Sequence, residues 1–350
     1  MILAISEKEF KDYLTSRRFL ILFGFLLAVV VLSLIQVNLQ MQSWNVDSSE
    51  APKVYDVLQG LNFYLTAAGA IFAISLGFDA VTKEREGKTL NVLMGHPVFR
   101  DQIILGKMLG GAITIAVAVL ITGLIMIGTL LGIGITIESY PRLLTYFLTL
   151  YLYLMVFFTM GVAFSAHAKS SGNALMYALV VYLALTVLLM PVSGILAHYV
   201  VGPQPEKPPE LKEMEERMRA IYESSNGNLT DEQIQELMEL SEKMSAISDE
   251  YYNKTHEWMR EYWGFIEKIQ VVSPEQDFRT ISNYVLNPHI KKENPFDYEV
   301  YTPEYGTFEP PEYSLSESLS FVRNEFIALF AYLVLWFVVA YLGFVRAEIR

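Results

Sequence analysis

The sequence predicts an all-α integral membrane protein with six transmembrane helices, cytoplasmic N- and C-termini, and a mainly helical extracytoplasmic domain between helices 5 and 6. Three observations predict this fold class. The 350-residue chain is 53% hydrophobic, and its apolar residues gather into blocks of about 20, the length that a helix needs to cross a bilayer. Lys and Arg are distributed unequally among the short loops between these blocks. The long segment before the last block is polar and strongly acidic.

The charge of the chain is concentrated in one segment. Residues 202–322 contain 11 Lys and Arg against 25 Asp and Glu, a net charge of −14, whereas the rest of the chain carries a net charge of +2. The sequence has no basic patch of the kind that indicates nucleic-acid binding. The chain has no cysteine, which excludes disulfides, thiolate metal sites and cysteine catalysis from its own residues.

The first predicted element, over residues 1–18, is an amphipathic helix on a membrane surface. Ile5, Phe10, Tyr13 and Leu14 recur at roughly helical spacing beside basic residues, a pattern typical of interfacial helices. Six apolar blocks then predict membrane spans at 19–37, 58–78, 103–135, 143–164, 174–201 and 326–345. The first block is too long for a signal peptide and lacks a cleavage site. Pro191 and Gly194 predict a kink in the fifth span.

The orientation follows from the short loops, because Lys and Arg accumulate on the cytoplasmic side. Lys53 is the only Lys or Arg in the loop after the first block, and Arg142 is the only one in the loop after the third. The basic segments are 1–18, 83–107, 167–173 and 346–350. Both termini are therefore expected inside, and the acidic segment outside.

The acidic segment is predicted to fold as a helical hairpin. A helix is expected over 210–224, and Thr230 with Gln233 forms a capping box before a helix of roughly 40 residues, about 60 Å long. Ser273 and Pro274 predict the start of a shorter helix, and residues 287–312 are expected to be irregular. The predicted domains are 1–201 (amphipathic helix and spans 1–5), 202–322 (extracytoplasmic hairpin) and 323–350 (span 6).

Two features limit the chemistry of the chain. Gly87, Lys88 and Thr89 resemble the end of a phosphate-binding loop, but Thr82 stands where that loop needs its first glycine, so no nucleotide site is predicted. The middles of the predicted spans contain no charged residue, whereas ion-coupled transporters generally use one there. The energy for any transport must therefore come from another protein.

The loop after the second block carries a recognisable pattern, KEREGKTLNVLMGHPVFRDQIILGK over residues 83–107. It resembles the first cytoplasmic loop of ABC-2 type permeases, the membrane subunits of one class of ABC exporters. It departs from that pattern by an inserted Lys88 and by Met94 in place of a leucine. The matching positions are Glu84, Arg85, Glu86, Gly87, Thr89, Leu90, Leu93, Pro97, Val98, Arg100, Gly106 and Lys107. The segment KEFKDYLTSRRF, residues 8–19, resembles the amphipathic N-terminal helix of the same family.

This resemblance implies a permease subunit in the cell membrane that is not itself an enzyme. A helix in the loop would dock on a separate ABC ATPase subunit, which would hold the ATP and Mg²⁺, while this chain binds no cofactor or metal. The other implied partners are a second permease copy or paralogue and membrane lipid. Glu84, Arg85 and Glu86 would set the register of docking. The apolar residues Leu90, Val92, Leu93 and Met94 would anchor it. ATP hydrolysis by that partner would drive export of a substrate.

A second hypothesis is a membrane-anchored scaffold or receptor whose outer helical domain binds an extracellular partner. The long acidic hairpin, lined with aromatic residues, would suit that role. An intramembrane hydrolase is the least favoured reading, because the chain lacks the cysteine, paired intramembrane aspartates, HExxH motif and serine elbow of such enzymes.

The predicted topology can be tested at Asn228 and Asn253, which begin N-x-T glycosylation triplets. Because both lie in the predicted outer domain, we expect both to be modified when the chain is expressed in a host that glycosylates its surface proteins. The measurement is the mass of the purified chain before and after enzymatic deglycosylation. Finding both asparagines unmodified on the mature protein would contradict their placement outside.

Overall fold

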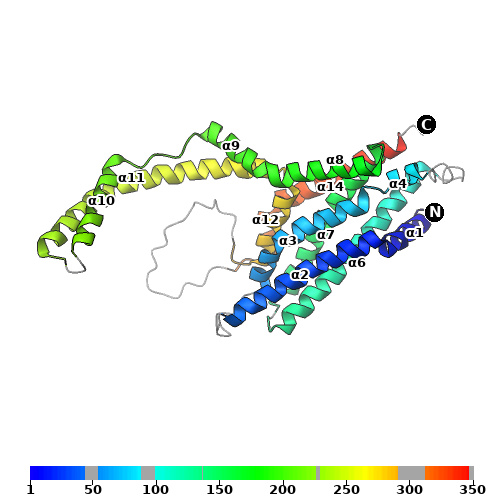
Figure 1. Ribbon diagram of the computed structural model, residues 1–350, viewed down its shortest axis with the longest axis horizontal. Coiled ribbons are helices and arrows are strands. Elements are labelled where there is room, and N and C mark those ends of the chain that lie inside the picture. The colour runs from blue at the N-terminus through cyan, green and yellow to red at the C-terminus, as the bar shows by residue number, and fades with distance from the viewer. Residues whose placement is uncertain (44–53, 88–98, 136, 226–228, 291–311, 347–350) are drawn as a thin grey trace. The chain divides into compact units, whose positions relative to one another are not determined.

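The structure, a computed structural model, describes residues 1–43, 54–87, 99–135, 137–225, 229–290 and 312–346, and every regular element in these ranges is a helix (Figure 1). Six helices in the described chain are long and apolar enough to cross a membrane: Arg17–Gln36, Val57–Glu86, Arg100–Gly132, Tyr140–His167, Ser171–Val201 and Arg323–Val345. The predicted helical class and the six spans are confirmed. The side of the membrane on which each loop lies stays a prediction.

The chain divides into two compact units. The first contains Met1–Leu189, Val271–Lys291 and Thr307–Arg350, and the described part of the second is residues 190–225 and 229–270. The helices of the first unit are α1 (Ile2–Thr15), α2 (Arg17–Ser43), α3 (Val54–Gly77), α4 (Thr82–Glu86), α6 (Arg100–Gly132), α7 (Tyr140–His167), α8 (Ser171–Leu183), the π-helix η1 (Ala184–Leu188), α12 (Pro274–Leu286), α13 (Leu315–Phe321) and α14 (Arg323–Val345).

Helix α7 is the centre of the first unit. It packs against α3, α6, α8, α12 and α14, and Figure 1 shows it among these helices. Its buried tyrosines are satisfied, since Tyr146 Oη donates to Asn62 Oδ1 (2.9 Å) and Tyr153 Oη donates to the Thr66 carbonyl (3.1 Å). Buried hydroxyls need such partners. The rings of Tyr146 and Tyr153 therefore fill the core with their hydroxyls paired.

Helices α3 and α7 cross at two glycines. A Cβ atom built at Gly161 would lie 3.0 Å from the Ile74 carbonyl oxygen, and one at Gly77 would meet the backbone of Phe158 and Val162. Small residues at such crossings let two backbones approach closely in a membrane. The close contact therefore depends on both glycines.

Helix α12 packs among the spans. Ser273 Oγ accepts from the Gln276 N–H (3.3 Å) and Pro274 occupies the first turn, so the predicted start of this helix is confirmed. Phe278 is fully buried, with its ring centroid 5.1 Å from that of Tyr153 in α7. Arg142 of α7 holds the far end of α12 by donating to the Val285 carbonyl (2.7 Å). The outer placement predicted for 202–322, which includes α12, stays a prediction.

The second unit contains most of α9 (Leu189–Val201), α10 (Pro209–Ser224) and α11 (Asp231–Gln270). The predicted helix over 210–224 and the following 40-residue helix are both confirmed. Thr230 and Gln233 form the predicted reciprocal cap, with each side chain accepting from the other's backbone N–H. Arg217 and Glu236 pair across α10 and α11 at 2.6 Å, as expected for a hairpin. Of the segment 287–312, residues 291–311 lie outside the described residues.

The fifth span departs from regular α-helix at η1, residues Ala184–Leu188, rather than at the predicted kink. Helix α9 continues through Pro191 and Gly194. Proline lacks an N–H and its ring crowds the carbonyl four residues earlier. The wider π turn lies directly before Pro191 and provides the extra room there.

Replacement of Gly77 by alanine tests the α3–α7 contact. Because a methyl group there would meet backbone atoms of α7, we expect Gly77→Ala to lower the stability of the purified protein by about 1–3 kcal/mol. Gly60→Ala in the same helix is the matched control, since a Cβ there has nothing within 4 Å. The readout is the thermal unfolding temperature in detergent. Equal temperatures for both variants would show that the crossing tolerates a larger residue.

Candidate functional site

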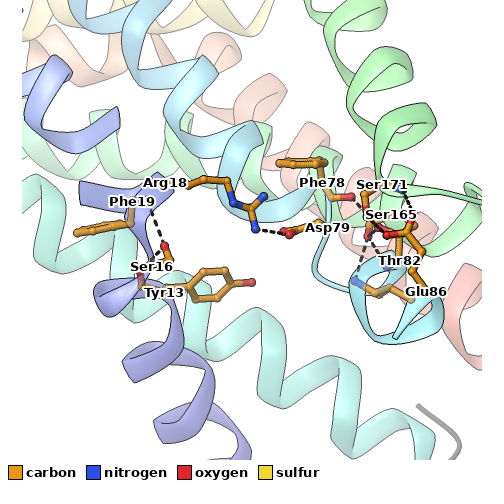
Figure 2. Close-up of polar contacts among 11 residues, drawn as sticks. Tyr13, Ser16, Arg18, Phe19, Phe78, Asp79, Thr82, Glu86, Ser165 and Ser171 are labelled. Atoms are coloured by element: carbon orange, nitrogen blue, oxygen red, sulfur yellow. Dashed lines mark hydrogen bonds and ion pairs between the residues drawn. The ribbon is translucent and has the colours of Figure 1, made fainter. Parts of the chain in front are cut away.

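The short helix α4 follows α3 in the chain, and its first turn contacts the C-terminal part of α7. The backbone N–H groups of Val81 and Thr82 donate to Ser165 Oγ of α7 at 2.9 and 3.1 Å. The Thr82 hydroxyl lies 2.9 Å from Ser171 Oγ at the start of α8. These contacts, drawn in Figure 2, fix the first turn of α4 to the junction of α7 and α8.

The charged residues of α4 extend this attachment to both helix ends at the junction. The Arg85 guanidinium donates to the carbonyls of Ala168 (2.7 Å) and Ala166 (3.1 Å), at the C-terminus of α7. The Glu86 carboxylate accepts from the backbone N–H and hydroxyl of Ser171 (2.8 and 2.9 Å), at the N-terminus of α8. A cation at a helix C-terminus and an anion at an N-terminus both oppose the partial charges of the helix ends.

Glu84, another charged residue of α4, joins a buried ion triad. Its Oε1 lies 2.7 Å from Lys107 Nζ of α6, which also lies 2.9 Å from Glu9 Oε1 of α1. The Lys107 side chain is only 3% exposed. A buried ammonium is stable only when anions and hydrogen bonds compensate its lost hydration. The triad therefore ties α1, α4 and α6 together.

Glycines bring α1 close enough to α6 for the triad to form. A Cβ atom at Gly106 would lie 2.7 Å from the Ile5 side chain, and one at Gly110 would lie 2.7 Å from Glu9 Cβ. Both glycines are on the face of α6 that packs against α1. A larger residue at either position would push Glu9 away from Lys107.

An ion pair at the start of α2 completes the polar region. Arg18 and Asp79 form a short ion pair, and the Arg18 guanidinium carbon lies 5.2 Å from the ring centre of Phe78. Ser16 Oγ accepts from the Phe19 N–H (3.1 Å) and caps α2. Figure 2 shows this pair between the Tyr13 ring and the α4 contacts.

The structure brings together only part of the predicted site. Glu84, Arg85, Glu86, Gly87 and Lys107 lie in or beside α4 and its contacts. Gly106 faces α1, and Arg100 Nη1 donates to the Val345 carbonyl of α14 (3.1 Å). Asn253 is exposed on α11. The remaining predicted residues, Thr89, Leu90, Leu93, Pro97 and Asn228, lie outside the described residues.

Sequence reasoning missed the partners of α4. Glu9, Ser165 and Ser171 are each far along the chain from the residues that they bind. Glu9, in the predicted amphipathic helix 1–18, and Ser171, in the basic loop 167–173, lie in segments to which the sequence draws attention, whereas Ser165 does not. Within the described ranges, no group of three or more His, Asp and Glu side chains is placed to hold a metal ion.

Comparison with known proteins places this arrangement in context. A family model described as "ABC-2 family transporter protein" matches residues 3–349. The chain is similar to a "Probable ABC transporter permease protein NosY" of Stutzerimonas stutzeri, 32% identical over 117 residues, which are 33% of this chain and 41% of that protein. A protein of the same description from Pseudomonas aeruginosa is 43% identical over 51 residues, 15% of this chain and 18% of that protein. The matched part of the chain thus spans less than half the length of either curated relative.

The buried triad can be tested by removing its cation. Because Lys107→Met leaves two buried carboxylates without their ammonium, we expect it to cost about 3–5 kcal/mol of stability. Adding Glu9→Gln and Glu84→Gln removes the two carboxylate charges that faced the ammonium and should restore part of the loss. The measurement is thermal unfolding in detergent.

Lys11→Ala is the control for this series, because Lys11 lies on α1 and forms an exposed pair with Glu7, a kind of pair that contributes little. Its unfolding temperature should match that of the unaltered chain. A Lys107→Met protein as stable as this control would show that the triad does not hold the three helices together.

Proposed function

The chain belongs to the ABC-2 family of transporter proteins, as a multi-pass membrane permease subunit without an ATPase domain, and we propose that it is the membrane half of an exporter driven by a separate ATPase. In this proposal the two basic ends of the chain and the loop that contains α4 are cytoplasmic. The second unit lies outside. The substrate leaves the cytoplasm when the ATPase closes on ATP.

The observation that supports this proposal most is the set of contacts made by α4. Three of its four charged residues, Glu84, Arg85 and Glu86, each bind a different part of the bundle. Helix α4 ends directly before residues 88–98, the part of the loop in which we propose that the ATPase docks. A displacement of α4 would therefore act on α1, α6, α7 and α8 together.

The types of contact favour movement of the helices as a group. Lys107 and Glu84 are largely buried, so separating them would leave charges in a poorly hydrated place, which is costly. Arg85 holds two carbonyls at one helix end, and charge-assisted hydrogen bonds of this kind are stronger than neutral ones. The network is more easily shifted as a unit than broken. Packed helices that shift together are a common form of switching.

The proposed partners are an ABC ATPase subunit, which would supply ATP and Mg²⁺, and a second copy of this chain or a paralogue. Each of the two relatives is described as a probable ABC transporter permease, and we propose the same kind of assembly for this chain. The scaffold hypothesis requires only that the hairpin of α10 and α11 bind an outer partner. It gives no reason for the contacts of α4.

The coupling proposal predicts the behaviour of a double variant, Glu84→Ala with Arg85→Ala. We expect the variant to insert into the membrane but to lose the ATPase, because α4 would no longer be held in position for docking. The measurement is the yield of ATPase that co-purifies with the tagged chain from membranes containing both proteins. Membrane-inserted chain is quantified in the same samples.

Two further variants sharpen this experiment. Arg85→Ala with Glu86→Ala leaves the buried triad intact and removes only the contacts to the ends of α7 and α8, so it separates coupling from stability. Arg219→Ala removes an exposed ion pair on α10 and should leave the yield unchanged. A normal ATPase yield from both double variants would refute the role of α4.

A further inference from the structure

A cavity of about 440 Å³ lies among α1, the start of α2, the end of α3, α4 and α6. The proposed coupling of α4 needs the ion pairs around this cavity but does not need the space itself. Its lining combines basic side chains (Lys8, Arg18, Lys83 and Lys107) with acidic ones (Glu9, Asp12, Asp79 and Glu84). A ligand that carries both signs of charge would therefore find partners of both signs in this lining.

The inner wall of the cavity contains a polar atom without a partner. Tyr13 lines the cavity, and its hydroxyl oxygen is buried and forms no hydrogen bond with any described residue. Figure 2 shows the ring extending toward the Arg18–Asp79 pair. Leaving a buried hydroxyl unpaired costs free energy. A ligand that hydrogen-bonds to Tyr13 would remove that cost.

Three carboxylates lie around Tyr13 in the lining of the cavity. Burial raises the pKa of the Tyr13 phenol well above its usual value, and the carboxylates of Glu9, Asp79 and Glu84 raise that pKa further. Arg18 lowers the pKa, but it acts less strongly than any of the three carboxylates. The buried Tyr13 hydroxyl, beside these carboxylates, can accept a hydrogen bond from an ammonium group.

The exposed edge of the cavity has the opposite character. Lys8 and Lys83 line the cavity and are exposed to solvent. Neither forms an ion pair with another described residue. Asp12 is the one exposed carboxylate beside them. Two ammonium groups at the opening of a cavity suit a phosphate.

We propose that this cavity binds the headgroup of a phospholipid that carries a primary ammonium, a phosphoethanolamine group. The ammonium is the end of such a headgroup farthest from the acyl chains, so it enters first and reaches Tyr13 and the carboxylates. The phosphate follows and lies between Lys8 and Lys83. Helix α1, predicted to lie on the membrane surface, forms one wall, so the acyl chains can remain in the bilayer.

The test is carried out on the full-length chain without any ATPase, so its result does not depend on the proposed coupling. The delipidated protein in detergent is titrated with phosphatidylethanolamine, phosphatidylcholine or phosphatidylglycerol. Bound lipid is counted by native mass spectrometry, and thermal unfolding is recorded in parallel. We expect phosphatidylethanolamine to bind most tightly. The choline headgroup has no N–H donor, and the glycerol headgroup has no cation.

Tyr13→Phe is the most informative variant. It removes one hydrogen bond to the ligand, so we expect phosphatidylethanolamine to bind roughly two- to tenfold more weakly. Without lipid, the variant should unfold at a temperature no lower than that of the unaltered chain, because the lost hydroxyl has no protein partner there. Lys8→Ala with Lys83→Ala should also weaken binding, whereas Lys11→Ala, on the same helix but paired with Glu7, should not.

Several outcomes would overturn the proposal. Tighter binding of phosphatidylglycerol would show a site for phosphate alone. If all variants bind the lipid equally well, the lipid binds at another site. If no lipid raises the unfolding temperature, the cavity does not bind a lipid headgroup. Soluble phosphoethanolamine is added as a separate arm. If it binds as tightly as the lipid and displaces it, the site takes a free solute and the lipid assignment fails.

Discussion

A buried ammonium group in the third span sets the arrangement of the first unit. Lys107 is almost fully enclosed, and its charge is compensated by one carboxylate from α1 and one from α4. Helix α1 is not among the six candidate spans, and α4 is a five-residue helix at the end of the second one. Both helices are held against α6 because the buried Lys107 ammonium needs their carboxylates as partners. The hydrogen bonds of α4 to the ends of α7 and α8 then extend the same constraint across the bundle.

Close backbone packing makes these contacts possible. Glycines in α6 let α1 pack closely against it, and glycines in α3 and α7 let these two helices approach each other. Side chains as short as serine can therefore bridge neighbouring helices. The exposed pairs on the second unit differ in kind. Glu250 and Lys254, for example, are well exposed, and such pairs contribute little because water screens them and their ordering costs entropy. The buried contacts around α4 therefore matter far more to the structure than the more numerous exposed charges.

Much of the fold could be predicted from the sequence because the signals are local. Span length, the Thr230 cap and the Ser273–Pro274 helix start each depend on a few adjacent residues, and all three are confirmed. The packing of α12 among the spans was not predictable, since its apolar stripe with Phe278 would equally suit a hairpin outside the membrane. The same holds for Glu9 with Lys107 and for Val81 with Ser165. The residues of each pair are far apart in the chain and meet only in the folded structure, so no sequence spacing predicts them.

The separation of Glu9 and Lys107 along the chain also constrains how the protein is made. Glu9 is synthesised 98 residues before Lys107, which at cellular rates of translation is about 5–20 s. During that interval α1 has no ammonium to bind, and its carboxylate must remain hydrated. The N-terminal helix therefore waits at the bilayer surface until the third span has been inserted. Assembly of this end of the bundle is therefore ordered in time, because α1 can form its ion pair with Lys107 only after the third span has been synthesised.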